Sequence, residues 1–189
     1  MYVLKSENYL KFTGIDTFTF VDSLISNSVK TDKLFFSYLL GPDGKILNWF
    51  ICETKPEEIL YIYQEIENLH NLSQMFNKYK IRINCELQIV KENKYLSVDT
   101  SDDTITVNPT FETPDTTSWE DFELIAELPS RKIIENGIIP NEVSWLDYFV
   151  DYEKGCFMGQ EQTSRIKFRG RPRRLLKTSS SRTQVMEKI

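Results

Sequence analysis

Residues 154–161 read Lys-Gly-Cys-Phe-Met-Gly-Gln-Glu, and the rest of the chain reads as a scaffold that presents them. A lone cysteine lies between two glycines, which can adopt backbone conformations closed to other residues and let a ligand approach closely. Lys154 and the N-terminus of the helix expected to follow both favour a thiolate at Cys156, whereas Glu153 and Glu161 disfavour it. Cys156 is therefore either a reactive thiol or an inert cysteine in a tight glycine turn.

Charge is divided unevenly between the body of the chain and its C-terminal end. The formal net charge is −5, but residues 1–164 carry 14 basic and 27 acidic residues, a net charge of −13. Residues 165–177 contain no acidic residue and seven basic ones: Arg165, Lys167, Arg169, Arg171, Arg173, Arg174 and Lys177. An acidic body with a basic tail suggests either a contact between the two or an anionic partner such as RNA or an acidic protein.

Composition predicts a globular chain of one domain or two small ones. It has 189 residues, of which 40% are hydrophobic and 13% aromatic, enough for a packed core. Cys52, Cys85 and Cys156 are odd in number and form no Cys-x-x-Cys pair, so we expect neither a disulfide framework nor a metal site. The single histidine, His70, argues against a Cys–His hydrolase. No signal peptide or bilayer-length apolar run is present, so we expect a cytoplasmic protein without membrane contact.

Turn chemistry predicts a β-hairpin in the first third of the chain. Residues 34–40 and 45–52 are nearly continuous apolar runs, and Gly41-Pro42-Asp43-Gly44 between them has the residues that a tight turn requires. Pro56, followed by two glutamates and by apolar residues spaced three and four apart, predicts an amphipathic helix to Tyr79, bent or broken at His70-Asn71. Other strands are expected at 9–13, 81–90, 94–98 and 104–107, with a turn at 91–93. Other helices are expected from Asp16 to about Val29, from Ser118 to about Glu127, and at 132–135, where Gly137 ends the helix. A loop is expected at 108–118 and frayed residues at 178–181.

The octapeptide at 154–161 resembles the K-G-C-Y-x-G-Q-E signature of the YgfZ-like folate-binding proteins, relatives of the aminomethyltransferase (T-protein) of the glycine cleavage system. Phe157 in place of the usual tyrosine is the one departure within it. Weaker similarities to the same family extend over most of residues 9–176: the hairpin at 38–47, Lys78-Tyr79-Lys80-Ile81-Arg82, Pro140-Asn141-Glu142 and the Arg165-Ile166-Lys167-Phe168-Arg169-Gly170 continuation.

The resemblance implies an α+β, folate-binding fold of the aminomethyltransferase/YgfZ type, with antiparallel sheets and packed helices. It implies tetrahydrofolate as the ligand and support of iron–sulfur cluster assembly or repair in enzymes that include tRNA-modifying ones. Cys156 is then the candidate catalytic residue, although whether the chain is an enzyme stays open. The loop around it is shaped by Lys154, Gly155, Phe157, Gly159, Gln160 and Glu161, and Arg165 and Arg169 are candidate anion contacts. We expect 1–54 with 108–164 to form the folate-binding domain, 55–107 an inserted subdomain, and 165–189 a basic tail.

Several departures from the family limit what the resemblance implies. Asn108-Pro109-Thr110 replaces the usual D-P-R step, the arginine expected before G-I-P is not found at 122–129, and the aminomethyltransferase's G-Y-T-G-E step is absent. The chain ends about 28 residues after Glu161, where the family continues into a β-barrel domain. The alternatives are therefore a non-catalytic module that binds RNA or an acidic protein, or a degenerate relative without folate. The missing barrel further predicts an apolar face near Phe157, Phe168 and Leu175–Leu176, covered by a partner or by a second copy.

Overall fold

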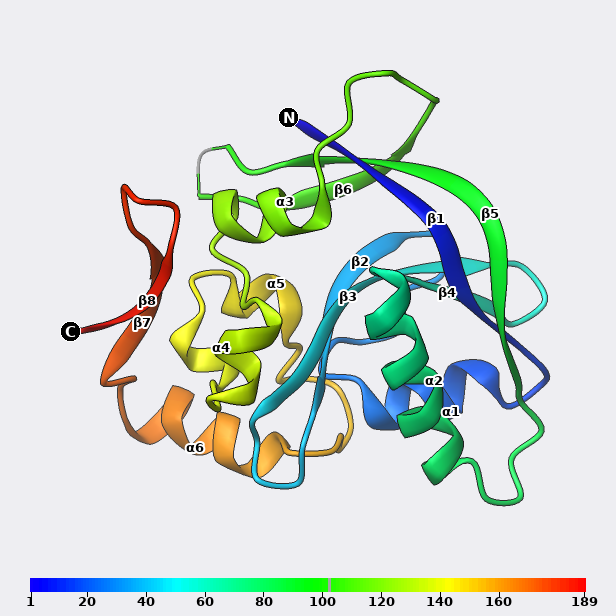
Figure 1. Ribbon diagram of the computed structural model, residues 1–189. Helices are drawn as coiled ribbons and strands as arrows, with labels where there is room; N and C mark the ends of the chain where they lie inside the picture. The colour runs from blue at the N-terminus through cyan, green and yellow to red at the C-terminus, as the bar shows by residue number, and fades with distance from the viewer. Residues whose placement is uncertain (102) are drawn as a thin grey trace.

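A computed structural model describes residues 1–101 and 103–189, and it shows a strongly curled antiparallel sheet with helices on both faces (Figure 1). The sheet has six strands in the order β2-β3-β4-β1-β5-β6, and β7 and β8 form a separate hairpin. The strands are β1 (Tyr2–Thr13), β2 (Leu34–Leu40), β3 (Ile46–Lys55), β4 (Ile59–Tyr63), β5 (Glu86–Asp99), β6 (Thr106–Thr110), β7 (Arg174–Thr178) and β8 (Gln184–Lys188). The helices are α1 (Thr17–Leu24), α2 (Ile66–Tyr79), α3 (Trp119–Ile125), α4 (Arg131–Glu135), the 3₁₀ turn η1 (Pro140–Glu142), α5 (Leu146–Phe149) and α6 (Gln160–Arg169). The expectation of mixed helix and antiparallel sheet is confirmed.

The hairpin of β2 and β3 forms where turn chemistry predicts it. The amide of Gly41 donates to the carbonyl of Lys45 at 2.8 Å, and the amide of Gly44 donates to the carbonyl of Gly41 at 2.9 Å. Gly44 has a φ of +77°, a conformation that favours glycine. The helix predicted from Ser118 is also confirmed, because the Ser118 hydroxyl accepts from the amide of Asp121 at 3.0 Å and caps α3.

The helix predicted from Pro56 begins ten residues later than expected. Glu57 and Glu58 adopt φ values of +62° and +54° in a turn, and β4 follows in the centre of the sheet, between β3 and β1. Pairing with two neighbouring strands overrides a local sequence that suits a helix start. From residue 66 the helix prediction is confirmed, with Leu69 buried on α2, but the break expected at His70-Asn71 is not found because α2 is continuous from Ile66 to Tyr79.

A single long strand, β5, replaces the two strands and turn predicted over 81–98. The polar residues at 92–93 mark a bulge, because Ser6 of β1 pairs with Lys94 while Asn8 pairs with Lys91. Two residues of β5 thus oppose one of β1, which bends the strand without ending the pairing. Residues 81–85 lie outside the strand, and 108–110, predicted as loop, belong to β6.

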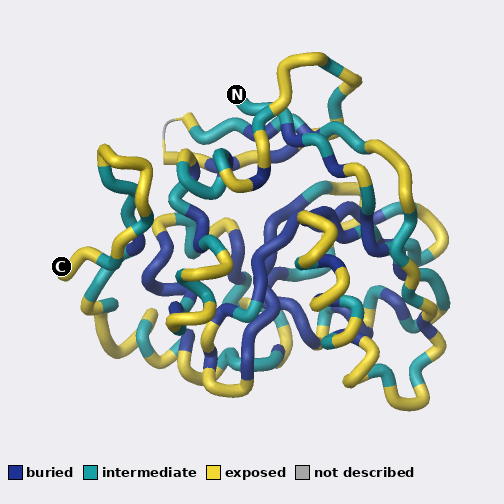
Figure 2. The backbone as a smooth tube through the Cα atoms, in the orientation of Figure 1, coloured by how far each residue is buried: buried dark blue, intermediate teal, exposed yellow. Residues whose placement is uncertain are grey.

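Alternating residues of the strands fill two cores, one on each face of the sheet. Buried residues are concentrated in the central strands (Figure 2). Phe36 and Trp49 face a core closed by α3, α5 and β7. Phe35 and Phe50 face the other core, which α1 and α2 cover. This period-2 alternation is what lets nearly continuous apolar strands serve two cores.

The C-terminal segment folds onto the body as the hairpin of β7 and β8, so the expectation of fraying is wrong. The amide of Ser179 donates to the carbonyl of Thr183 at 2.9 Å in its turn, and Leu176 is buried in the core. Residues 55–107, expected as an inserted unit, contribute β4 and β5 to the same sheet as β1, β2 and β3. The division of the chain into domains stays a prediction.

Candidate functional site

Lys154 anchors the loop that carries Cys156 to the end of α1. Its side chain is 3% exposed, and its ammonium donates to the carbonyls of Asp22, Ile25 and Asn27 at 2.5, 3.0 and 3.0 Å. Burial lowers the pKa of Lys154, and the Asp22 carboxylate, 3.2 Å away, opposes that effect. An ammonium has three donors, and all three are used. Lys154 therefore has no N–H left to donate to Cys156.

Gly159 fixes the other end of the loop against the β2–β3 hairpin. Its φ of +78° favours glycine, and a Cβ there would lie 2.5 Å from the carbonyl oxygen of Gly41 and 3.1 Å from Cα of Gly44. Gly44 in turn lies against Gln162, to whose Cβ an added Cβ would come within 2.7 Å. Two stretches singled out separately in the sequence thus pack glycine against glycine.

Between Lys154 and Gly159, the loop carries a buried aromatic side chain and an exposed thiol. Phe157 is buried in the core, with the ammonium of Lys154 5.5 Å from its ring centroid. Cys156 is exposed and lines a groove of about 550 Å³ with residues of α1 and of the segment after it: Phe18, Thr19, Asp22, Ser23, Ser28 and Val29. Gly155 has open space where a side chain would be, so its lack of one is not required by packing. The groove around Cys156 contains no histidine; His70 is exposed on α2.

The polar end of the signature lies on α6. Gly159 is its N-cap, Gln160 its first residue, and Glu161 faces solvent with its side chain 3.8 Å from Arg165 in an i,i+4 pair. Such an exposed pair contributes about 0.3–0.5 kcal/mol. Arg169, the other candidate anion contact, is exposed at the C-terminal end of the same helix.

The Pro140-Asn141-Glu142 step binds the tail to the body. The Glu142 carboxylate is buried, accepts from the amide of Ile139 at 3.1 Å and pairs with Arg174 at 2.5 Å. The Asn141 amide donates to the carbonyl of Thr163 in α6 at 3.3 Å. These residues therefore connect η1 to α6 and to β7 and have a structural role.

A second, polar pocket of about 140 Å³ lies between β3, α2, α3 and α4, and sequence reasoning missed it. Asn48 is 5% exposed, and its side-chain oxygen is buried without a hydrogen-bond partner in the described part of the chain. Glu123 accepts from the indole N–H of Trp49 at 3.0 Å; burial raises the pKa of its carboxyl to about 8, against the lowering effect of that hydrogen bond. The remaining lining residues are Leu47, Asn68, Asn71, Met75, Arg131, Ile134 and Glu135. A buried acceptor beside a protonatable carboxyl suits a ligand that presents N–H donors.

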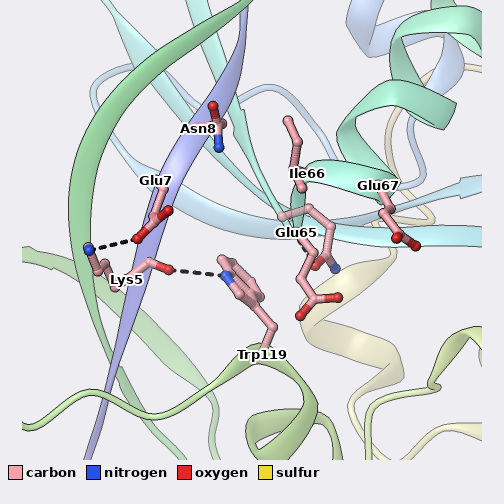
Figure 3. Close-up of a pocket in the computed structure, with 8 residues that line it drawn as sticks. Lys5, Glu7, Asn8, Glu65, Ile66, Glu67 and Trp119 are labelled. Atoms are coloured by element: carbon pink, nitrogen blue, oxygen red, sulfur yellow. Dashed lines mark hydrogen bonds and ion pairs between the residues drawn. The ribbon is translucent and has the colours of Figure 1, made fainter.

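The pocket drawn in Figure 3 is less suited to folate than the pocket beside Asn48. Its volume is about 340 Å³, and Glu7, Glu65 and Glu67 lie around it. Lys5 is paired with Glu7 at 2.8 Å, and its carbonyl accepts from the indole of Trp119 at 3.2 Å. Its carboxylates outnumber its one cation, so it disfavours anionic ligands such as a folate with its glutamate carboxylates.

The predicted apolar face is largely covered by the chain itself. Phe157 and Leu176 are buried in the core that β7 helps to close. Phe168 differs: it is 69% exposed at the end of α6. Among residues 1–101 and 103–189, no three His, Cys, Asp or Glu side chains are grouped closely enough to hold a metal ion. In the same described ranges, no helix combines the length and the apolar character needed to cross a membrane.

Neither a protein-family model nor a curated protein matches the sequence. Among solved structures, the fold is similar to the crystal structure of glycine cleavage system aminomethyltransferase T from Bartonella henselae, with a TM-score of 0.45 and 12% sequence identity. The similarity covers 69% of this chain and 33% of that one, so this chain spans about a third of its length.

Proposed function

We propose that this protein binds a reduced folate and supports iron–sulfur enzymes, including tRNA-modifying ones, in the manner that its resemblance to the YgfZ-like proteins implies. The octapeptide supports the proposal from the sequence. An aminomethyltransferase/YgfZ-like fold, a cytoplasmic location and iron–sulfur enzymes or assembly proteins as partners belong to the same proposal. The three free cysteines are in keeping with a reducing compartment.

The pocket between β3 and α3 is the observation that carries folate binding. The pyrimidine edge of a pterin presents an amine and a ring N–H, which need neighbouring oxygen acceptors. Glu123 and the unpartnered oxygen of Asn48 supply acceptors of this kind in one small space. Ligand pockets commonly measure about 300–1,000 Å³. One of 140 Å³ would therefore hold the ring end of a folate and leave the rest on the surface.

Cys156 would act on a partner rather than on the ligand in this pocket. The pocket and the groove around Cys156 share no lining residue. The thiol is exposed on a loop that Lys154 and Gly159 hold in place. A fixed, solvent-exposed thiol is suited to contact a client protein, and we assign it that role without assigning a chemical step.

Calorimetric titration with tetrahydrofolate tests the pocket. Wild-type protein should bind one equivalent, and Asn48→Leu should lose binding. The free Asn48→Leu protein should be no less stable than wild type, because the substitution removes a buried oxygen that has no partner, a defect of about 1–3 kcal/mol. Asn93→Leu, on the exposed bulge of β5, is the matched control and should bind normally. Absence of heat and of a melting shift with wild type would refute folate binding.

Complementation tests the role of the thiol separately. In a strain that lacks a full-length YgfZ-like protein, Cys156→Ala should fail to restore function, whereas Cys85→Ala should restore it. Equal rescue by Cys156→Ala and wild type would remove the thiol from the mechanism while leaving folate binding intact. Light scattering tests whether a second copy is a partner, and a strictly monomeric mass at high concentration contradicts it.

A further inference from the structure

Seven of the nine cations at residues 165–189 fall into two groups; of the other two, Arg165 pairs with Glu161 of its own helix and Lys188 lies near the C-terminal end. Four of them pair with carboxylates of the body: Lys167 with Asp147, Arg174 with Glu142, Lys177 with Glu127 and Arg182 with Asp121. Within the described ranges, Arg169, Arg171 and Arg173 have no carboxylate at ion-pair distance, and all three are exposed. The tail thus contacts its own acidic body and also keeps three arginines free within five residues.

An exposed aromatic side chain adjoins these arginines. Phe168 packs edge-on against Tyr152 with ring centroids 5.7 Å apart, and both residues line a groove of about 420 Å³. The groove is also lined by Lys30, Lys167, Asn27, Val150 and three carboxylates, Asp147, Asp151 and Glu153. Asp147 is paired with Lys167, and Asp151 accepts from the hydroxyl of Ser28. Tyr152 and Phe168 therefore pack against each other in the lining of this groove.

We propose that Phe168, Arg169, Arg171 and Arg173 form a docking surface for single-stranded nucleic acid. The planar guanidinium groups bind backbone phosphates, and Phe168 stacks on an unpaired base at the groove. An acidic protein segment would use the arginines but would gain little from the aromatic ring. A duplex is disfavoured because its bases are not free to stack on Phe168. Residues 1–164 carry a net charge of −13 and repel phosphate, so the nucleic acid is expected to bind at this basic patch alone.

Fluorescence anisotropy with labelled 15-nucleotide uridine and thymidine oligomers tests this surface between 50 and 300 mM salt. The logarithm of the binding constant should fall with the logarithm of salt concentration, with a slope of about −2 for three phosphates. Changing Arg169, Arg171 and Arg173 together to Gln should remove most of that slope. Phe168→Ala should weaken binding by about 5- to 150-fold and leave the slope unchanged. The two oligomers distinguish RNA from DNA as the preferred strand.

A control variant removes three positive charges from other parts of the surface. Lys78, Lys91 and Lys132 are exposed and have no ion pair within the described residues, so their combined change to Gln matches the triple arginine variant in charge. It should leave binding within about twofold. Equal losses in the two triple variants, or affinity unaffected by Phe168→Ala, would overturn the proposal. Binding of poly-glutamate as tight as that of the oligomers would instead identify an acidic protein as the partner.

Discussion

Glu123 offers a direct test of whether the pocket beside it is as poorly solvated as its geometry indicates. Burial raises the pKa of its carboxyl from an ordinary value of 4.5 to about 8. Glu123→Gln keeps the shape of the side chain and an oxygen that accepts from the Trp49 indole, but removes the titration. The substitution therefore isolates the free energy of ionising this one group.

The sign and size of the effect follow from proton linkage. Between pH 4.5 and 8 the folded chain holds a proton on Glu123 that the unfolded chain has released. The resulting stability is fully present below pH 4.5 and is lost as pH rises through about 8. With about 1.4 kcal/mol for each tenfold change, the wild type should lose on the order of 4 kcal/mol more than Glu123→Gln between pH 5 and 8.5.

Urea unfolding at pH 5, 6, 7 and 8.5 measures this difference. The free energy of unfolding of the wild type should fall more steeply with pH than that of Glu123→Gln, and the two curves should approach or cross toward pH 8.5. Glu120→Gln, an exposed neighbour on α3, should follow the wild type. Parallel curves for wild type and Glu123→Gln would refute a carboxyl that stays protonated near neutral pH.

Three further predictions concern the signature loop. Lys154→Met leaves three buried carbonyls without a donor and should lower the free energy of unfolding by at least about 1–3 kcal/mol, whereas exposed Lys33→Met should change it little in the same denaturant series. Gly159→Ala should destabilise by more than about 1 kcal/mol in thermal melts, while Gly155→Ala, which meets open space, should lie close to wild type. A disulfide reagent should label one thiol in the native protein, Cys156, and all three after unfolding; rapid labelling of a second thiol in the native state contradicts the structure.

The sequence predicted best those elements whose cause is local. The turn at 41–44 and the cap at Ser118 depend on backbone geometry and hydrogen bonds within a few residues, and both are confirmed. The residues after Pro56 also have the local features of a helix N-terminus. A strand, β4, nevertheless forms at 59–63, because β1 and β3 pair with it on both sides. No reading of residues 56–63 alone contains that information.

In the candidate site, too, local features were predictable from the sequence and features that depend on tertiary packing were not. The octapeptide located Cys156 and its loop, but the function of Lys154 as an anchor depends on carbonyls 127–132 residues away. The pocket was missed because Asn48 and Glu123 meet through tertiary packing. One signal was available: an asparagine within the apolar run 46–51 is a polar group that the sheet must bury.

The hairpin of β2 and β3 connects the two parts of the proposed function. Its strand β3 supplies Asn48 and Trp49 to the ligand pocket, and its turn packs against Gly159 of the signature loop. Because β3 is paired along its length with β2, we expect a shift at the turn to reach the next residues of β3. The pocket and the exposed thiol therefore have a continuous physical connection although they share no lining residue.

This connection predicts an effect of Gly159 on a ligand that it does not touch. A Cβ at residue 159 must displace the hairpin turn, with which it would collide at 2.5 Å from the Gly41 carbonyl. Gly159→Ala should therefore weaken tetrahydrofolate binding at least about fivefold, corresponding to a coupling of about 1 kcal/mol, while Gly155→Ala should not. The measurement is a calorimetric titration at a temperature where both variants are fully folded. Equal affinities would mean that the pocket and the thiol operate independently, and that the glycine contact serves the stability of the fold alone.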